Sequence, residues 1–175
     1  MDINKASYET VIQFGTLKDF QKKIKKSKDT ISDVISSVNE DGISLLEKSL
    51  SSRNFEISKY LLENGAEVNN VSKDGYNEFH FIAANINEIG ALEIAEILFE
   101  KDTSLIQKDK KVGNSAFYAL CIEAFKKRLP EVMAFMERCF SKVENIDDKN
   151  KCGLSIRNLI SERGSDELKN ILITK

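Results

Sequence analysis

The chain has 175 residues, 41% of them hydrophobic and 31% charged, which suits one domain with a buried core. Its 26 basic and 28 acidic residues give a net charge of −2, which does not describe a general nucleic-acid or membrane-surface binder. The single histidine, His80, excludes a multi-histidine metal site, and the single proline excludes Pro-rich classes.

Two features bear on where the chain works. Residues 1–5 do not begin a signal peptide, and the most apolar stretch, 79–84, is too short to span a bilayer. The odd set of Cys121, Cys139 and Cys152 favours reduced thiols. We expect a cytoplasmic chain, or one delivered to a host cell by a route without a classical signal peptide.

The region before residue 39 predicts two helices, with one apolar stripe on Tyr8, Val11 and Ile12 and another on Leu17, Phe20 and Ile24. The second helix is crowded with lysines, which are Lys18, Lys22, Lys23, Lys25, Lys26 and Lys28. Such a run is usually the solvated face of a terminal cap. The alternative is a patch for nucleic acid or a phosphate ligand, but arginines and interleaved aromatic residues are missing.

Four glycines mark a repeating pattern from residue 39 onwards. Gly42, Gly75, Gly113 and Gly153 follow one another at intervals of 33, 38 and 40 residues, and a mostly apolar helical run comes after each. The pattern predicts turns at these glycines and repeated units between them. We divide the chain into 1–38, 39–71, 72–106, 107–146 and 147–175, with the first and last units as caps.

The second unit is the clearest. It predicts a short helix within 42–50, a break at 51–54 and a helix over 55–62 that ends at a left-handed Gly65. The later units predict helices within 75–84, 92–99, 116–122 and 131–140, the last beginning at Pro130, and then two apolar stripes, on Ile156, Leu159 and Ile160 and on Leu168, Ile171 and Leu172.

Asp41-Gly42 and the run from Leu61 to Asn69, LLENGAEVN, resemble an ankyrin repeat, whose pattern runs D-x-x-G-x-T-P-L-H-x-A-A and then L-L-x-x-G-A-x-V-N. The T-P-L-H slots begin at Ser44, Asn77, Ser115 and Ser155; none has the proline, and one has the histidine. The resemblance implies an all-α, ankyrin-like helical repeat solenoid with about five helix-turn-helix units, short or vestigial hairpin turns and a single domain over 1–175.

Few residues are candidates for chemistry. The resemblance gives His80 a structural role, as a hydrogen-bonding residue at a helix start between adjacent units. Cys121 and Cys139 lie in apolar surroundings, Cys152 in a turn, and no close pair is present to chelate zinc. We expect no metal, no cofactor and no catalysis; an enzyme using Cys152 or a carboxylate would need a deep pocket around that residue.

The charge is unevenly distributed. Residues 39–106 hold 5 basic and 13 acidic residues, a net charge of −8, whereas 107–175 have a net charge of +4. The acidic middle would attract a partner with a basic patch. We therefore expect a protein partner, with neither nucleic acid nor membrane favoured, and a monomer when the chain is free.

Ankyrin-like stacks bind through turn tips and the exposed face of each first helix, and the resemblance carries this surface to particular positions. Those partner-binding positions are Glu40, Asp41, Ile43, Ser51, Ser52, Lys73, Asp74, Tyr76, Asn85, Lys111, Val112, Asn114 and Glu123. Tyr76 is the expected anchor because exposed aromatic residues often supply interface energy. Ile43 and Val112 are its apolar companions.

The favoured function is a non-catalytic protein-protein interaction module. The composition, rich in Lys, Ile, Asn and Glu, hints at an AT-rich bacterial or phage genome. By analogy of fold alone, the chain would then be an immunity protein, an inhibitor or an effector.

Overall fold

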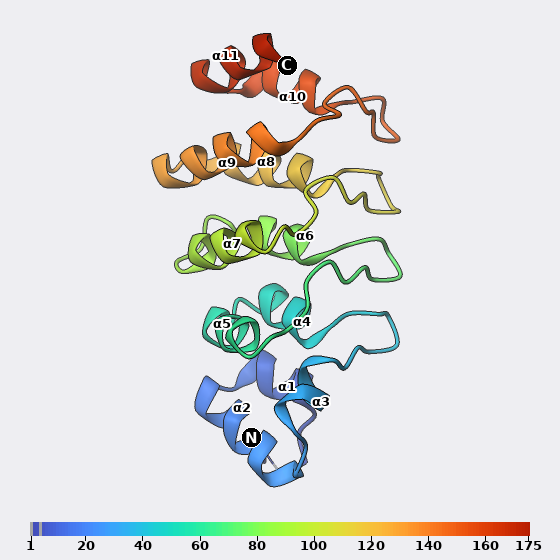
Figure 1. Cartoon of the computed structure of the whole chain (residues 1–175), viewed down its shortest axis with the longest axis vertical. Helices are drawn as coiled ribbons and strands as arrows, with labels where there is room; N and C mark the ends of the chain where they lie inside the picture. Colours follow the sequence, from blue (N-terminus) through green and yellow to red (C-terminus); the bar gives the residue numbers. More distant parts are fainter. Residues whose placement is uncertain (1, 4) are drawn as a thin grey trace.

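The computed structural model describes residues 2, 3 and 5–175 and is all-α, as predicted (Figure 1). Within these residues there are eleven helices and no strand; the only β-type pairings are isolated bridges between Val38 and Ser44 and between Lys108 and Ser115. No helix of the described residues is long and apolar enough to cross a membrane.

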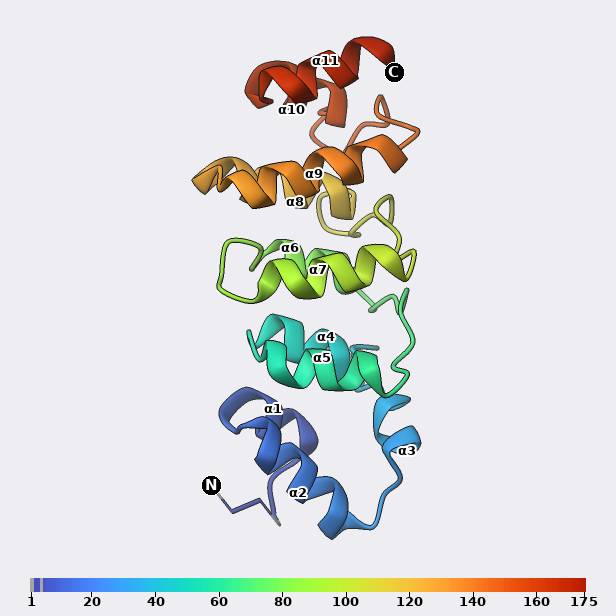
Figure 2. The ribbon, with the colours of Figure 1, turned by 60° about the vertical axis from the view of Figure 1, so that its left-hand side comes forward.

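Ten of the helices form five helix-turn-helix pairs, and the pairs follow one another along one axis in chain order (Figures 1 and 2). The pairs are α1 (Tyr8–Phe14) with α2 (Leu17–Ser27), α4 (Leu45–Ser51) with α5 (Phe55–Glu63), α6 (Glu78–Ala83) with α7 (Ala91–Glu100), α8 (Ala116–Lys127) with α9 (Pro130–Lys142), and α10 (Ile156–Arg163) with α11 (Asp166–Thr174). The short α3 (Ile31–Ile35) lies between the first two pairs and was not predicted.

The helices pack in two columns. The first-helix column consists of α1, α4, α6, α8 and α10, each in contact with the next; the second-helix column consists of α2, α5, α7, α9 and α11, which also contact one another in order. Because each helix touches its own partner and the next helix or helices of its column, a pair buries apolar surface that it could not bury alone.

The core runs the length of the stack. Leu61, Phe79, Phe135 and Phe140 are fully buried, and the Phe117 and Phe140 rings stack with centroids 5.7 Å apart. The predicted apolar stripes supply most of this core, although Tyr8, Leu17, Ile24 and Ile171 are only partly buried at the two ends. Cys121 and Cys139 are buried and Cys152 is exposed, as predicted.

The four predicted turn glycines all have left-handed backbones. Their φ angles are +75° at Gly42, +85° at Gly75, +78° at Gly113 and +78° at Gly153, and Gly65 after α5 has +89°. At the start of each turn, a side-chain oxygen accepts hydrogen bonds from backbone amides of the same turn; the acceptors are Asn39, Ser72, Asp109 and Asn150. Each turn is therefore fixed locally before any neighbour is considered.

The residue two positions after each glycine caps the next helix. Ser44, Asn77, Ser115 and Ser155 each accept a hydrogen bond from the amide three residues further on, at 3.1–3.4 Å. These are the four positions that open the T-P-L-H slots, and a side-chain acceptor there satisfies an amide that the helix itself leaves unpaired. The helices then run further than predicted in the fourth pair, where α8 reaches Lys127 rather than residue 122.

Candidate functional site

The hairpin loops before α4, α6, α8 and α10 project from the stack on one side and lie one above another (Figure 1). Backbone hydrogen bonds join them: the amide of Lys73 donates to the carbonyl of Asp41 at 2.8 Å, that of Lys110 to Asp74 at 2.7 Å, and that of Lys151 to Val112 at 2.8 Å. We call the exposed charged residues at these tips the tip row; it consists of Glu40, Asp41, Lys73, Asp74, Lys110, Lys111 and Lys151.

The closest approach between hairpins is at Gly75. A Cβ atom there would lie 2.7 Å from the carbonyl oxygen of Lys108 and 3.0 Å from the amide of Lys110. At Gly153, the last tip, a Cβ would meet nothing within 4 Å. The glycine at position 75 is therefore required both by its φ angle and by the hairpin that follows it.

The predicted binding positions fall into three groups. Exposed ones are Glu40, Asp41, Ser51, Lys73, Asp74 and Lys111, and half-buried ones are Ile43, Ser52, Tyr76, Val112, Asn114 and Glu123. Nine of these twelve lie in the hairpin loops, whereas Ser51 and Ser52 lie at the end of α4 and Glu123 lies within α8. The thirteenth, Asn85, does not belong with them.

Asn85 is 7% exposed, so its assignment to the binding surface was wrong. Its Nδ2 donates to the carbonyls of Leu50 at 3.1 Å and Phe81 at 3.2 Å, and its Oδ1 accepts from Nε of Arg53 at 2.9 Å. Asn85 joins α4 to the loop after α6, and every polar atom of its side chain is used for this. The offset from the turn glycine is the same as for Ser52 and Glu123, but α6 ends at Ala83, so position 85 lies beyond the helix and turns inward.

Tyr76, the predicted anchor, is half-buried with its ring held by two neighbours. It lies edge-on to His80, with centroids 5.3 Å apart, and to Phe81, at 6.0 Å. Burial raises the pKa of the Tyr76 hydroxyl, and the carboxylates of Asp109 and Asp74 add to this effect. The ring is preorganised, so little rotamer entropy remains to be lost when a partner packs on it.

Sequence reasoning missed three apolar residues, of which Leu154 and Phe81 lie near this surface. Leu154 is 48% exposed and directly follows Gly153, in the position that Ile43, Tyr76 and Asn114 occupy after their glycines. The same register rule would have found it. Phe81 is half-buried beside Tyr76, and Ile89, in the loop between α6 and α7, is fully exposed; nothing in the repeat pattern marks either position.

Two buried glutamates lie where the second and third pairs meet. Oε2 of Glu47 accepts from the amide of Ser44 at 2.7 Å and from Nδ2 of Asn70 at 2.5 Å, whereas Glu78 accepts from the amides of Asn69 and Asn70 at 2.9 and 3.0 Å. Oε1 of Glu47 is buried with no partner among the described residues. Burial raises the pKa of Glu47 to about 7, with the charge of Glu78 as a lesser cause, and burial likewise raises the pKa of Glu78.

His80 has the structural role that the resemblance implies. Its Nδ1 lies 2.8 Å from Oδ1 of Asn77 at the start of α6, and its Nε2 lies 3.4 Å from the carbonyl oxygen of Asn114 in the next hairpin. Burial lowers the pKa of the ring. Both nitrogens face groups of the fold itself, so His80 links the third pair to the fourth.

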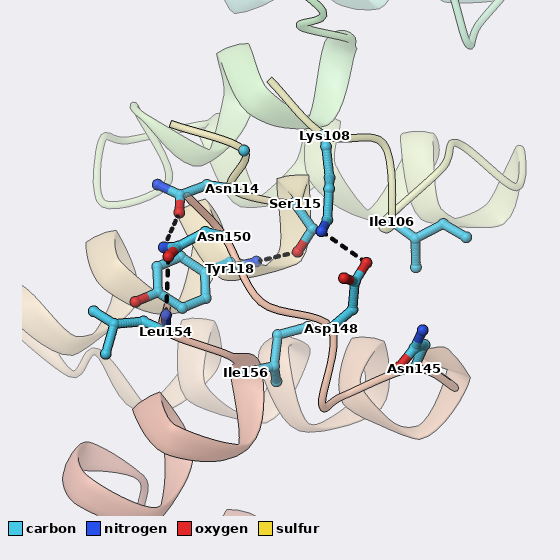
Figure 3. A pocket seen from close by; sticks show the side chains of 11 residues that line it. Ile106, Lys108, Asn114, Ser115, Tyr118, Asn145, Asp148, Asn150, Leu154 and Ile156 are labelled. Carbon is cyan, nitrogen blue, oxygen red and sulfur yellow. Dashed lines mark hydrogen bonds and ion pairs between the residues drawn. The ribbon is translucent and has the colours of Figure 1, made fainter. Parts of the chain in front are cut away.

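A small cleft lies between the hairpins that precede α8 and α10 (Figure 3). Nζ of Lys108 pairs with Asp148 at 2.7 Å across it, and Nδ2 of Asn150 donates to Oδ1 of Asn114 at 2.7 Å. Its volume of about 140 Å³ is below the roughly 300 Å³ at which small-molecule sites begin. Four of the polar side chains that line it, Lys108, Asp148, Asn114 and Asn150, are thus paired across the two hairpins.

Other candidate sites have structural explanations. Asp147 pairs with Arg157 at 2.6 Å, which lowers the pKa of that carboxyl, and its neighbour Asp148 is the partner of Lys108. Within residues 2, 3 and 5–175, no group of three or more His, Cys, Asp or Glu side chains is arranged to hold a metal ion. The lysines of α2 lie on its outer side, opposite the buried Phe20, and are exposed except for the half-buried Lys23.

The chain was compared with models of known protein families and with curated proteins. No family model matches the chain, and no curated protein matches it.

Proposed function

We propose that the chain is an ankyrin-like repeat protein that binds a protein partner through its hairpin tips and the exposed side of its first-helix column. The observation that carries this proposal is the set of three backbone hydrogen bonds between successive hairpins, from Lys73, Lys110 and Lys151. They hold side chains from four separate loops in one row, which gives a surface that is formed before binding and loses little entropy in it.

The geometry also favours binding over catalysis. The only histidine is used within the fold, and burial raises the pKa of the Cys121 thiol well above its usual value and that of Cys139 to about 12, so neither thiol is a nucleophile at neutral pH. The half-buried Tyr76, Ile43 and Val112 instead provide fixed apolar positions among the charged tips.

The proposal is tested by site-specific photo-crosslinking. Benzoylphenylalanine replaces Tyr76 in one preparation and Ile173, which is 82% exposed on α11 at the far end of the stack, in a matched control. A protein captured at position 76 and not at position 173 identifies a partner of the proposed surface. Capture at both positions alike, or at position 173 alone, contradicts it.

The captured partner is then purified and titrated by calorimetry. We expect Tyr76→Ala to weaken binding at least about tenfold, as removal of a central aromatic anchor does, with an unchanged circular dichroism spectrum. An affinity equal to that of the unaltered chain would show that the anchor was assigned to the wrong residue.

A further inference from the structure

Charge reverses along the tip row. The second pair's tip has Glu40 and Asp41, a charge of −2; the third has Lys73 and Asp74, which cancel; the fourth has Lys110 and Lys111, a charge of +2. The last tip adds Lys151. Since the hairpins are fixed in order by their backbone hydrogen bonds, the sign changes in one direction along the surface.

Among residues 2, 3 and 5–175, these charges take no part in ion pairs. In the part of the chain that the structure describes, no salt bridge includes any of the tip-row residues, whereas Lys59, Arg138 and Lys142 in the second-helix column each pair with a carboxylate of a neighbouring pair. One tip lysine has another role, since Nζ of Lys151 donates to the carbonyl of Lys110. The other tip charges remain available to a partner.

We infer that the tip row binds an extended segment of a partner protein that has a basic cluster at one end and an acidic cluster at the other, oriented with its basic end over Glu40 and Asp41. This inference rests on the proposed function and names its partner's chemistry. It refines the expectation of a partner with a basic patch, because Lys110, Lys111 and Lys151 would repel such a patch and attract acidic residues.

The spacing of the pairs sets the spacing of the clusters. Packed helices lie about 8–10 Å apart, so the acidic and the basic tips, two pairs apart, are separated by roughly 20 Å. An extended chain covers about 3.3 Å per residue, which places about six residues between the partner's two clusters. A nucleic acid does not fit, because it is negative along its whole length and would be repelled at Glu40 and Asp41.

The experiment uses energy transfer to read orientation. The exposed Cys152, beside the basic end of the tip row, takes an acceptor dye in the folded full-length chain, while Cys121 and Cys139 are buried. The probe is a synthetic peptide of about 20 residues with a lysine cluster and a glutamate cluster separated by about six Gly and Ser residues, with the donor dye on either end. We expect greater transfer from the donor on the glutamate end.

A charge-reversed variant, with Glu40→Lys, Asp41→Lys, Lys110→Glu and Lys111→Glu, supplies the comparison. We expect the preference between the two donor positions to be lost or inverted. The matched control, Lys59→Glu with Glu93→Lys, exchanges an ion pair in the second-helix column and should keep the orientation of the unaltered chain. Affinity for the peptide should fall about tenfold or more when salt is raised from about 0.05 to 0.5 M.

Three results would overturn the inference. Equal transfer from both ends would mean that the peptide has no fixed orientation, and equal or tighter binding of an all-glutamate peptide or single-stranded DNA would mean that the basic tips alone bind. A dimer of the unaltered chain that dissociates at high salt would mean that a second copy covers the row. In each of these cases the photo-crosslinking at position 76 can still succeed, so the two proposals fail separately.

Discussion

Charged side chains on the second-helix column pair across neighbouring helix pairs, whereas those of the tip row do not. Nζ of Lys59 on α5 lies 2.6 Å from Glu93 on α7, and Arg138 on α9 pairs with Glu96 on α7. At the tips, backbone hydrogen bonds join successive hairpins, as in the 2.8 Å bond from the amide of Lys73 to the carbonyl of Asp41, and the one ion pair described between hairpins, Lys108 with Asp148, lies outside the tip row. The second-helix column therefore uses charges for its own cohesion, whereas the tip row leaves most of its charges for a partner.

The largest effect is expected from the core that both sides share. Leu61 on α5 is fully buried, so Leu61→Ala should lower the free energy of unfolding by about 2–5 kcal/mol in denaturant titration. The matched control is Ile89→Ala, at a fully exposed apolar position, which should change it by less than about 0.5 kcal/mol. Similar losses at the two positions would contradict the assignment of the core.

The backbone contact between tips is tested at its two extreme glycines. Gly75→Ala and Gly153→Ala have the same strain from positive φ, but the new Cβ at position 75 would also lie 2.7 Å from a carbonyl oxygen. We expect Gly75→Ala to lower the free energy of unfolding more than Gly153→Ala does, by at least about 1 kcal/mol in chemical denaturation. The reason is that the hairpins before α6 and α8 must separate to admit the new Cβ. Equal costs would mean that the hairpins do not pack closely.

Because burial raises the pKa of Glu47 and of Glu78, the free energy of unfolding should decrease as the pH rises from about 4.5 to about 7. The folded-state pKa of Glu47 is about 7, above the ordinary value of 4.5, so the folded chain holds this proton more tightly than the unfolded chain does. The penalty for ionising it is absent below about pH 4.5, grows through the interval up to about pH 7 and is complete above that.

Glu47→Gln should therefore flatten this part of the stability profile and raise the free energy of unfolding at pH 8 relative to the unaltered chain. Thermal unfolding of both proteins from pH 4.5 to 8 measures the difference between them, in which the other carboxylates cancel. Part of the slope should remain because burial also raises the pKa of Glu78. Parallel profiles would show that Glu47 stays ionised throughout.

The smallest effects are expected from double-mutant cycles that compare charges of the second-helix column with charges of the tip row. A double-mutant cycle of Lys59→Ala and Glu93→Ala should give a coupling of about 0.2–1 kcal/mol, as exposed ion pairs do. The same cycle on Asp41 and Lys73, neighbours across two hairpins, should give none beyond error, since no ion pair joins their side chains. Coupling at the tips would show that their charges stabilise the stack after all.

The sequence predicted the local structure well because the turn chemistry is explicit in it. A glycine at a left-handed turn, a side-chain acceptor three or four residues before it and a small polar residue two after it together specify each hairpin and helix start, as at Asn39, Gly42 and Ser44. Prediction failed where spacing alone was used. Asn85 lies beyond the end of the short α6 and turns inward, and α3 has no apolar periodicity long enough to mark it.

The sequence predicted where the candidate surface lies, but not which of its charged side chains form ion pairs. The register after each glycine placed Ile43, Tyr76 and Asn114, and would have placed Leu154. Which charges are free could not be read from the sequence, because Glu40 and Glu93 differ only in whether a lysine from another helix pair reaches them. That depends on packing between residues more than 30 positions apart.

The most direct test of the account is amide hydrogen exchange at the tips, since everything rests on the hairpins being joined. The amides of Lys73, Lys110 and Lys151 should be protected from exchange, whereas the amide of Asp74, which donates to no acceptor among the described residues, should exchange rapidly. If the three lysine amides exchange as fast as that of Asp74, the hairpins move independently, and a single preformed row for binding does not exist.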